Sequence, residues 1–258
     1  MSEPDAWRTL RRFTAARIGL GRTGVSLPTD RALEFQAAHA AARTAVHEAL
    51  DADALAEALA ESFPGVAAVT TEAPDRTTYL KRPDLGRKLS AAGRASLAPA
   101  PCNVAVVICD GLSARAVSAH AAPLLADLLP RFSADGITVG PLTIVTEGRV
   151  AVGDAVGAAL GADLVLMLIG ERPGLSASDS LGIYITHGPR PGRSDAERNC
   201  ISNVRPEGLA YPQAAYRAHY LVSEALSRGH SGVALKDDTV SPDAIGGGSA
   251  AFLLSKTS

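Results

Sequence analysis

Short apolar runs separated by stretches of helical spacing constrain the fold of this chain more than any other feature. Residues 104–108 are continuously apolar and β-branched, as in strands that are buried on both faces of a sheet. The predicted strands are residues 104–108, 136–145, 163–169 and 181–186. The predicted helices are 113–129, which Ser113 can cap, the second half of 148–160, and 206–228. This alternation predicts an α/β fold with a Rossmann-like, largely parallel sheet flanked by helices.

The first hundred residues have a different, Ala-rich character that predicts an N-terminal helical extension. Trp7, Leu10, Phe13 and Ile18 recur at helical spacing and predict a first helix. We therefore divide the chain into an extension with its linker, residues 1–100, and an α/β domain, residues 101–258.

Two further helices are expected in this extension. Thr29 or Asp30 can cap a long helix that runs to Leu50, and Asp51 can cap a shorter one. Residues 70–101 are polar and contain four of the prolines, so we predict an irregular linker with one turn of helix at most.

Composition excludes several classes of protein. The 258 residues are 47% hydrophobic and carry a net charge of −2, which excludes wholesale disorder and a general nucleic-acid binder. Three cysteines without paired spacing predict neither a disulfide framework nor a cysteine zinc site. The acidic N-terminus lacks an apolar signal region, and the longest apolar run is too short for a bilayer. We expect a cytoplasmic protein without a membrane segment.

A glycine pattern near the N-terminus matches a dinucleotide-binding fingerprint only superficially. Residues 19–24 read G-x-G-x-x-G, but a predicted helix rather than a strand precedes them. No acidic residue ends a second strand about 20 residues further on, as such a site requires. We predict a glycine-rich loop there. The histidines are scattered (His39 and His47 are eight residues apart), so we predict no metal site.

Residues 168–175 directly follow a predicted strand, where open α/β sheets bind ligands. Gly170 allows a ligand to approach the backbone, and Pro173 with Gly174 forces a turn. Glu171 and Arg172 are then presented at the rim. Two interpretations stay open here: a ligand contact, or a surface turn with a solvated ion pair.

Residues 196–203 form a dense polar stretch around one cysteine. Cys200 can be a nucleophile, or it can be a small apolar side chain in a core. The sequence defines no histidine partner for it, so the pattern alone favours neither interpretation strongly.

Several blocks of sequence, in order along the chain, resemble the small (light) subunit of ethanolamine ammonia-lyase, an adenosylcobalamin-dependent radical enzyme. The blocks are residues 16–24, 33–43, 82–87, 110–114, 148–154, 168–175 and 197–203. The last three are the most specific, and the resemblance covers nearly the whole chain.

The resemblance implies a function that composition does not show. It implies a hetero-oligomer in which a barrel-shaped large subunit carries the substrate pocket. It also implies that the holoenzyme converts ethanolamine to acetaldehyde and ammonia. The small subunit, through its α/β domain, covers the cobalamin from the side and holds no catalytic residue. The location implied is the cytoplasm, inside or outside a bacterial microcompartment.

The family's cofactor contacts correspond to Val150, Glu171 and Cys200 in this chain. Glu171 is expected to accept hydrogen bonds from corrin amides, and Cys200 to lie beside the ring. The D-x-H-x-x-G pattern of base-off cobalamin domains is absent, so cobalt ligation by a histidine of this chain is not expected. The alternative function is an independent α/β enzyme with a nucleotide or acyl substrate, which the missing catalytic constellation disfavours.

Overall fold

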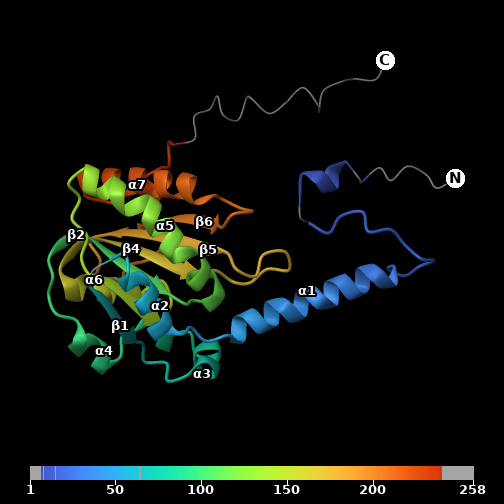
Figure 1. The fold of residues 1–258 in the computed structure, drawn as a ribbon, viewed down its shortest axis with the longest axis horizontal. Helices are drawn as coiled ribbons and strands as arrows, with labels where there is room; N and C mark the ends of the chain where they lie inside the picture. The colour runs from blue at the N-terminus through green and yellow to red at the C-terminus, as the bar shows by residue number, and fades with distance from the viewer. Residues whose placement is uncertain (1–6, 8, 15, 64, 240–258) are drawn as a thin grey trace, which may run out of the picture.

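Six strands form one mixed sheet in the order β1-β3-β2-β4-β5-β6 (Figure 1). A computed structural model describes residues 7, 9–14, 16–63 and 65–239. The strands are β1 (Val66–Thr70), β2 (Cys102–Cys109), β3 (Leu142–Thr146), β4 (Ala162–Gly170), β5 (Leu181–His187) and β6 (Arg198–Val204). The first four positions in the sheet pair in parallel, whereas β5 is antiparallel to both of its neighbours. The predicted α/β class with a largely parallel sheet is confirmed.

Helices cover both faces of the sheet, as expected from strands that are apolar on both sides. On one face lie α2 (Ala52–Ala60), α5 (Ala114–Ala134) and α7 (Tyr211–Arg228), and on the other lie α4 (Ala91–Ser96) and α6 (Val152–Leu160). Successive side chains of β2 alternate between the two faces and so contribute to both cores. Val106 points to the α5 side and Val107 to the α6 side. None of the helices in the described ranges is long and apolar enough to cross a bilayer.

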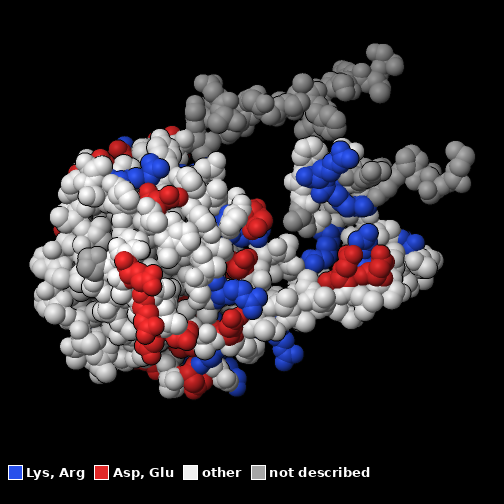
Figure 2. Space-filling view, viewed as in Figure 1, with Lys and Arg blue, Asp and Glu red and all other residues white. Residues whose placement is uncertain are grey.

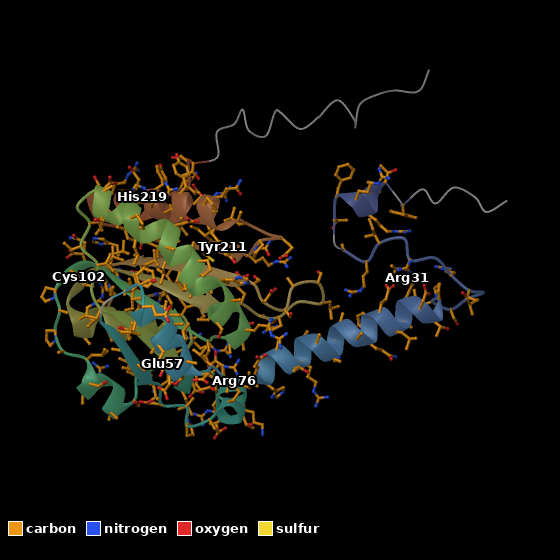
Figure 3. The ribbon with its side chains drawn as sticks, in the orientation of Figure 1. Arg31, Glu57, Arg76, Cys102, Tyr211 and His219 are labelled. Carbon is orange, nitrogen blue, oxygen red and sulfur yellow. The ribbon has the colours of Figure 1, made fainter. Side chains whose placement is uncertain are left out.

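Polar contacts fix α5 against α7 at the start and at the middle of α7. The buried His120 lies 2.8 Å from the Tyr211 hydroxyl, measured from Nδ1. His219 Nε2 lies 2.7 Å from a carboxylate oxygen of Asp135, just past the end of α5. Tyr211 and His219 are labelled in Figure 3, at the start and near the middle of α7. These histidines therefore join the two helices.

The described part of the extension before α2 stands away from the sheet (Figure 1). Helix α1 (Thr29–His47) meets the body through its C-terminal half, and Ala45 is its one buried residue among those described. Leu33 is 59% exposed and Phe35 is 45% exposed. This part of the extension therefore has no apolar core of its own within the described ranges.

Two of the predicted helix caps are confirmed and one is wrong. The Ser113 side chain accepts a hydrogen bond from Ala116 N at the start of α5, and Asp51 does the same for α2. Neither Thr29 nor Asp30 is the cap, because they are already the first two residues of α1. Pro28 occupies the capping position with extended backbone angles and makes no side-chain cap.

The predicted first helix shrinks to a 3₁₀ turn over Leu10–Arg12. Arg11 donates hydrogen bonds to the carbonyls of Ile18 and Gly19, which folds the segment back on itself and ends helical growth. Helix α7 begins at Tyr211 and not at residue 206, because Leu209 N donates to Asn203 O in a turn before it.

The linker expected over residues 70–101 is more regular than predicted. It contains α3 (Arg76–Lys81), a 3₁₀ helix (Leu85–Arg87) and α4. Strands β1 and β6 were not predicted either, and β1 shows that the sheet draws on residues before 100. The proposed division of the chain at residue 100 stays a prediction.

A buried ion pair attaches α6 to the edge strand β6. Arg198 and Asp154 form two parallel hydrogen bonds, each 2.7 Å long, and both side chains are at most 2% exposed. Arg198 also donates to the Thr186 hydroxyl and to Arg193 O. Such a fork holds β5, β6 and α6 in one register, and it leaves a buried charge if either partner is removed.

We expect Asp154→Ala to lower the free energy of unfolding by about 3–5 kcal/mol, because the Arg198 charge stays buried without its partner. The matched control is Asp195→Ala, since the exposed Asp195 lies 3.6 Å from Arg198 Nε. Asp195→Ala should lower the free energy of unfolding by less than about 1 kcal/mol. Urea unfolding of the full chain measures both values, and equal losses would contradict the assignment of the stabilising role to Asp154.

Candidate functional site

A buried arginine joins the carboxyl ends of two central strands. Arg76 Nη1 donates to Asp110 Oδ2 at 2.9 Å and to Glu147 Oε2 at 3.1 Å. Asp110 directly follows β2, and Glu147 directly follows β3. Arg76 Nε also donates to Val46 O, so the same side chain holds the end of α1. Figure 3 labels Arg76 where α1 and α3 meet the body.

Burial governs the protonation of these two acids. It raises the pKa of Asp110, although Arg76 and the backbone N–H groups of Glu147 and Gly148 favour the charged carboxylate. Burial and then the Asp110 charge raise the pKa of Glu147, against the effect of Arg76. The two carboxyls are therefore held close together by one cation, and neither points freely into solvent.

This network fixes the backbone that carries Val150. Asp110 accepts hydrogen bonds from Glu147 N at 3.0 Å and Gly148 N at 3.2 Å, and the Tyr79 hydroxyl donates to Gly148 O. A Cβ at residue 148 would lie 2.5 Å from Cys109 Sγ, so only glycine fits there. Val150 is thereby held half-buried against the apolar core on the α6 side.

Glu171 is positioned by the neighbouring strand ends. It follows β4, as predicted, and its Oε2 accepts hydrogen bonds from the Ser180 hydroxyl and from Asn203 N (3.2 Å). A Cβ at Gly170 would lie 2.1 Å from Ser113 O, so this strand end packs directly on the turn before α5. Within the described chain Glu171 makes no ion pair with Arg172, which argues against the interpretation as a solvated pair.

Cys200 lies on β6, opposite Tyr184 of β5. It is exposed, and its Sγ lies 3.4 Å from the Ser202 hydroxyl. No described histidine makes a hydrogen bond to it, so the geometry gives the nucleophile interpretation no support. The other interpretation from the pattern alone, a cysteine buried in the core, is wrong because the sulfur faces outward.

The structure brings Glu171 and Cys200 to one face of the sheet, with Tyr184 between them. A Cβ at Gly182, two residues before Tyr184, would lie 3.1 Å from Glu171 Oε1. Burial raises the pKa of Tyr184, and the nearby Cys200 and Glu171 raise it further. Val150 and Tyr184 both pack against the α6-side core. The result is an apolar surface with carboxylate, thiol and hydroxyl groups at its border.

Three residues of this surface were missed from the sequence: Tyr184, Ser180 and Asn203. Asn203 has a positive φ of 61°, which turns its backbone N–H toward Glu171. The available signal was the position of Asn203 at the end of the 197–203 block. Without the β5–β6 pairing, however, nothing in the sequence placed it beside Glu171.

The glycine pattern at residues 19–24 is a loop, as predicted. Gly19, Gly21 and Gly24 all have positive φ, and a short bridge joins Thr23 to Ser26. No group of three or more His, Cys, Asp or Glu side chains in the described part of the chain could hold a metal ion.

Comparison with known proteins matches residues 4–236 to the family model described as "Ethanolamine ammonia-lyase light chain (EutC)". The chain belongs to this family. It is 53% identical to the "Ethanolamine ammonia-lyase small subunit" of Pseudomonas syringae pv. tomato over 91% of this chain and 84% of the relative. A protein of the same name from Azotobacter vinelandii is 49% identical over 97% of this chain and 96% of the relative.

The three cysteines differ in exposure, which predicts a labelling order. With iodoacetamide at pH 8, Cys200 should react first, because its sulfur is exposed. Cys109 should stay unmodified in the folded chain, because burial raises the pKa of its thiol well above the ordinary value. Peptide mass spectrometry measures the order, and a urea-unfolded sample is the control in which all three react. Modification of Cys109 in the folded chain at the rate of Cys200 would contradict this geometry.

Proposed function

We propose that this chain is the small subunit of an adenosylcobalamin-dependent ethanolamine ammonia-lyase and binds the cobalamin at its interface with the large subunit. The observation that carries the proposal is membership of the light-chain family over residues 4–236. That membership favours a subunit over an independent α/β enzyme. The holoenzyme is proposed to convert ethanolamine to acetaldehyde and ammonia, in the cytoplasm or within a microcompartment there.

The surface at Val150, Glu171 and Cys200 fits the side of a corrin ring. A corrin is broad and apolar, with amide arms at its edge, so it needs a flat contact and a few polar acceptors. Val150 and Tyr184 supply apolar contact, and both pack against the α6-side core. Glu171 Oε2 is taken by Ser180 and Asn203, whereas Oε1 has no hydrogen bond within the described chain and is available to an amide N–H.

The role of these residues is to bind, orient and shield. Adenosylcobalamin, when bound, supplies the radical chemistry of the reaction, and protein groups supply its position and surroundings. Glu171 is prepared for that task because two donors already fix its carboxylate. Cys200 contributes a small, polarisable side chain beside the ring.

The partner proposed is the large subunit, and the extension supports an extensive contact with it. Exposed apolar side chains are spread over the extension: Trp7, Leu10, Phe13, Val25, Leu27, Leu33 and Phe35. Side chains of this kind mark interaction surfaces when several occur together. In the body, by contrast, the α2 surface is acidic, with Asp53, Glu57 and Glu61 exposed (Figure 2).

Co-expression with a large subunit tests the whole proposal. We expect one complex that survives gel filtration at micromolar concentration, shows the absorbance spectrum of bound cobalamin, and forms acetaldehyde from ethanolamine. This chain alone should form none. Separate elution of the two subunits, with and without adenosylcobalamin, or turnover by the isolated chain, would refute the proposal.

Glu171→Gln should weaken cobalamin binding to the complex by about tenfold to a hundredfold. The Gln side chain can keep one oxygen toward Ser180 and Asn203, but it then presents an amide donor where Glu171 presents an acceptor. Spectroscopic titration of the complex measures the dissociation constant.

The matched control is Glu61→Gln, the same change at an exposed position just past α2. It should leave the dissociation constant unchanged, and both variants should assemble normally. An unchanged dissociation constant for Glu171→Gln would remove Glu171 from the cobalamin site.

A further inference from the structure

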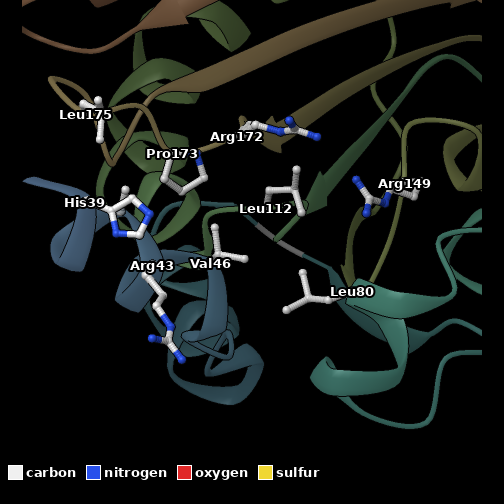
Figure 4. A pocket seen from close by; sticks show the side chains of 10 residues that line it. His39, Arg43, Val46, Leu80, Leu112, Arg149, Arg172, Pro173 and Leu175 are labelled. Carbon is white, nitrogen blue, oxygen red and sulfur yellow. The ribbon is translucent and has the colours of Figure 1, made fainter.

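A basic cleft of about 480 Å³ lies beside the proposed corrin surface (Figure 4). Its walls come from the C-terminal half of α1, from α3, and from the loops after β2, β3 and β4. The lining residues include three arginines and one histidine: Arg43, Arg149, Arg172 and His39. The described residues that line it include no Asp or Glu, so the cleft carries positive charge without an internal counterion.

Arg149 lacks a polar partner although it is half-buried. Its Nε is buried without a hydrogen bond in the described chain, and its guanidinium lies 4.6 Å from the centroid of the Tyr79 ring. Asp110 and Glu147 hydrogen-bond to Arg76, and no acid in the described chain forms an ion pair with Arg149. Stacking on Tyr79 holds the guanidinium in place and leaves its N–H donors for a ligand.

Arg172 approaches from the opposite wall. Figure 4 shows the side chains of Arg149 and Arg172 extending toward each other across the cleft. Arg172 is exposed, and its neighbour Glu171 is engaged by Ser180 and Asn203 instead. Two guanidinium groups that face each other without a carboxylate fit an anion between them, and phosphate oxygens match the planar guanidinium fork.

We infer that Arg149 and Arg172 bind the phosphodiester of the cobalamin nucleotide loop. The inference rests on the proposed function, because the two arginines directly neighbour Val150 and Glu171 in the chain. Arg149 also lines a second cleft together with Val150, so it stands between the corrin surface and the basic cleft. The phosphodiester is the anionic group that a cofactor held at Val150 and Glu171 would offer to this pair.

A corrinoid without the phosphodiester provides the test. The complex of the two subunits is titrated with adenosylcobalamin and with adenosylcobinamide, which keeps the corrin and its amides but lacks the nucleotide loop. Absorbance gives each dissociation constant. Arg172→Gln and Arg149→Gln should each weaken cobalamin binding by about tenfold or more and leave cobinamide binding unchanged.

Arg217→Gln, a change on α7 at the other face of the sheet, is the matched control and should alter neither constant. Arg172 is exposed, so its variant carries the test even if Arg149→Gln disturbs the packing on Tyr79. Equal weakening of both corrinoids, or of neither, would overturn the inference and leave the proposed function standing. If the unaltered complex bound neither corrinoid, the proposed function itself would fail.

Discussion

The position of Arg76 between Asp110 and Glu147 is the constraint on which the rest of the site depends. One guanidinium contacts the end of α1 through Val46 O, the turn after β2, and the loop after β3. Each of these groups has lost its water, so the segments must meet in the one arrangement that keeps the charges paired. This pairing of charges therefore also fixes the position of the loop that carries Gly148 and Val150.

The same pairing determines which charges are left for a ligand. Arg76 and Arg149 both lie against the Tyr79 ring, with guanidinium carbons 5.0 and 4.6 Å from its centroid. Asp110 and Glu147 both hydrogen-bond to Arg76. Within the described chain no carboxylate forms an ion pair with Arg149, whose Nε is buried without a hydrogen bond, so an anionic partner at this edge of the sheet would stabilise it.

Sequence patterns predicted the elements whose side chains alternate or repeat in the usual way, and they missed those that do not. The sequence alone predicted the strand at 104–108, from its apolar run, and the cap at Ser113. Strand β6 was not, because its buried residues Arg198, Ile201 and Val204 recur every third position, and its pairing with β5 shifts register between Leu181 and Ile183. Strand β1 was hidden by alanines in an Ala-rich region, since alanine favours helix. The resemblance supplied Val150, Glu171 and Cys200, but the contribution of Tyr184 needed the β5–β6 pairing.

Topology explains why this face of the sheet stays open. A parallel connection needs a crossover, usually a helix, and that helix covers one face, as α6 does between β3 and β4. Strands β5 and β6 are antiparallel and are joined by loops whose one helical element is the 3₁₀ turn Asp195–Glu197. Helix α7 then returns on the opposite face, against α5. The α6-side surface of β5 and β6 therefore receives no helix of its own from the described residues, and Cys200 and Ser202 are exposed there beside Tyr184.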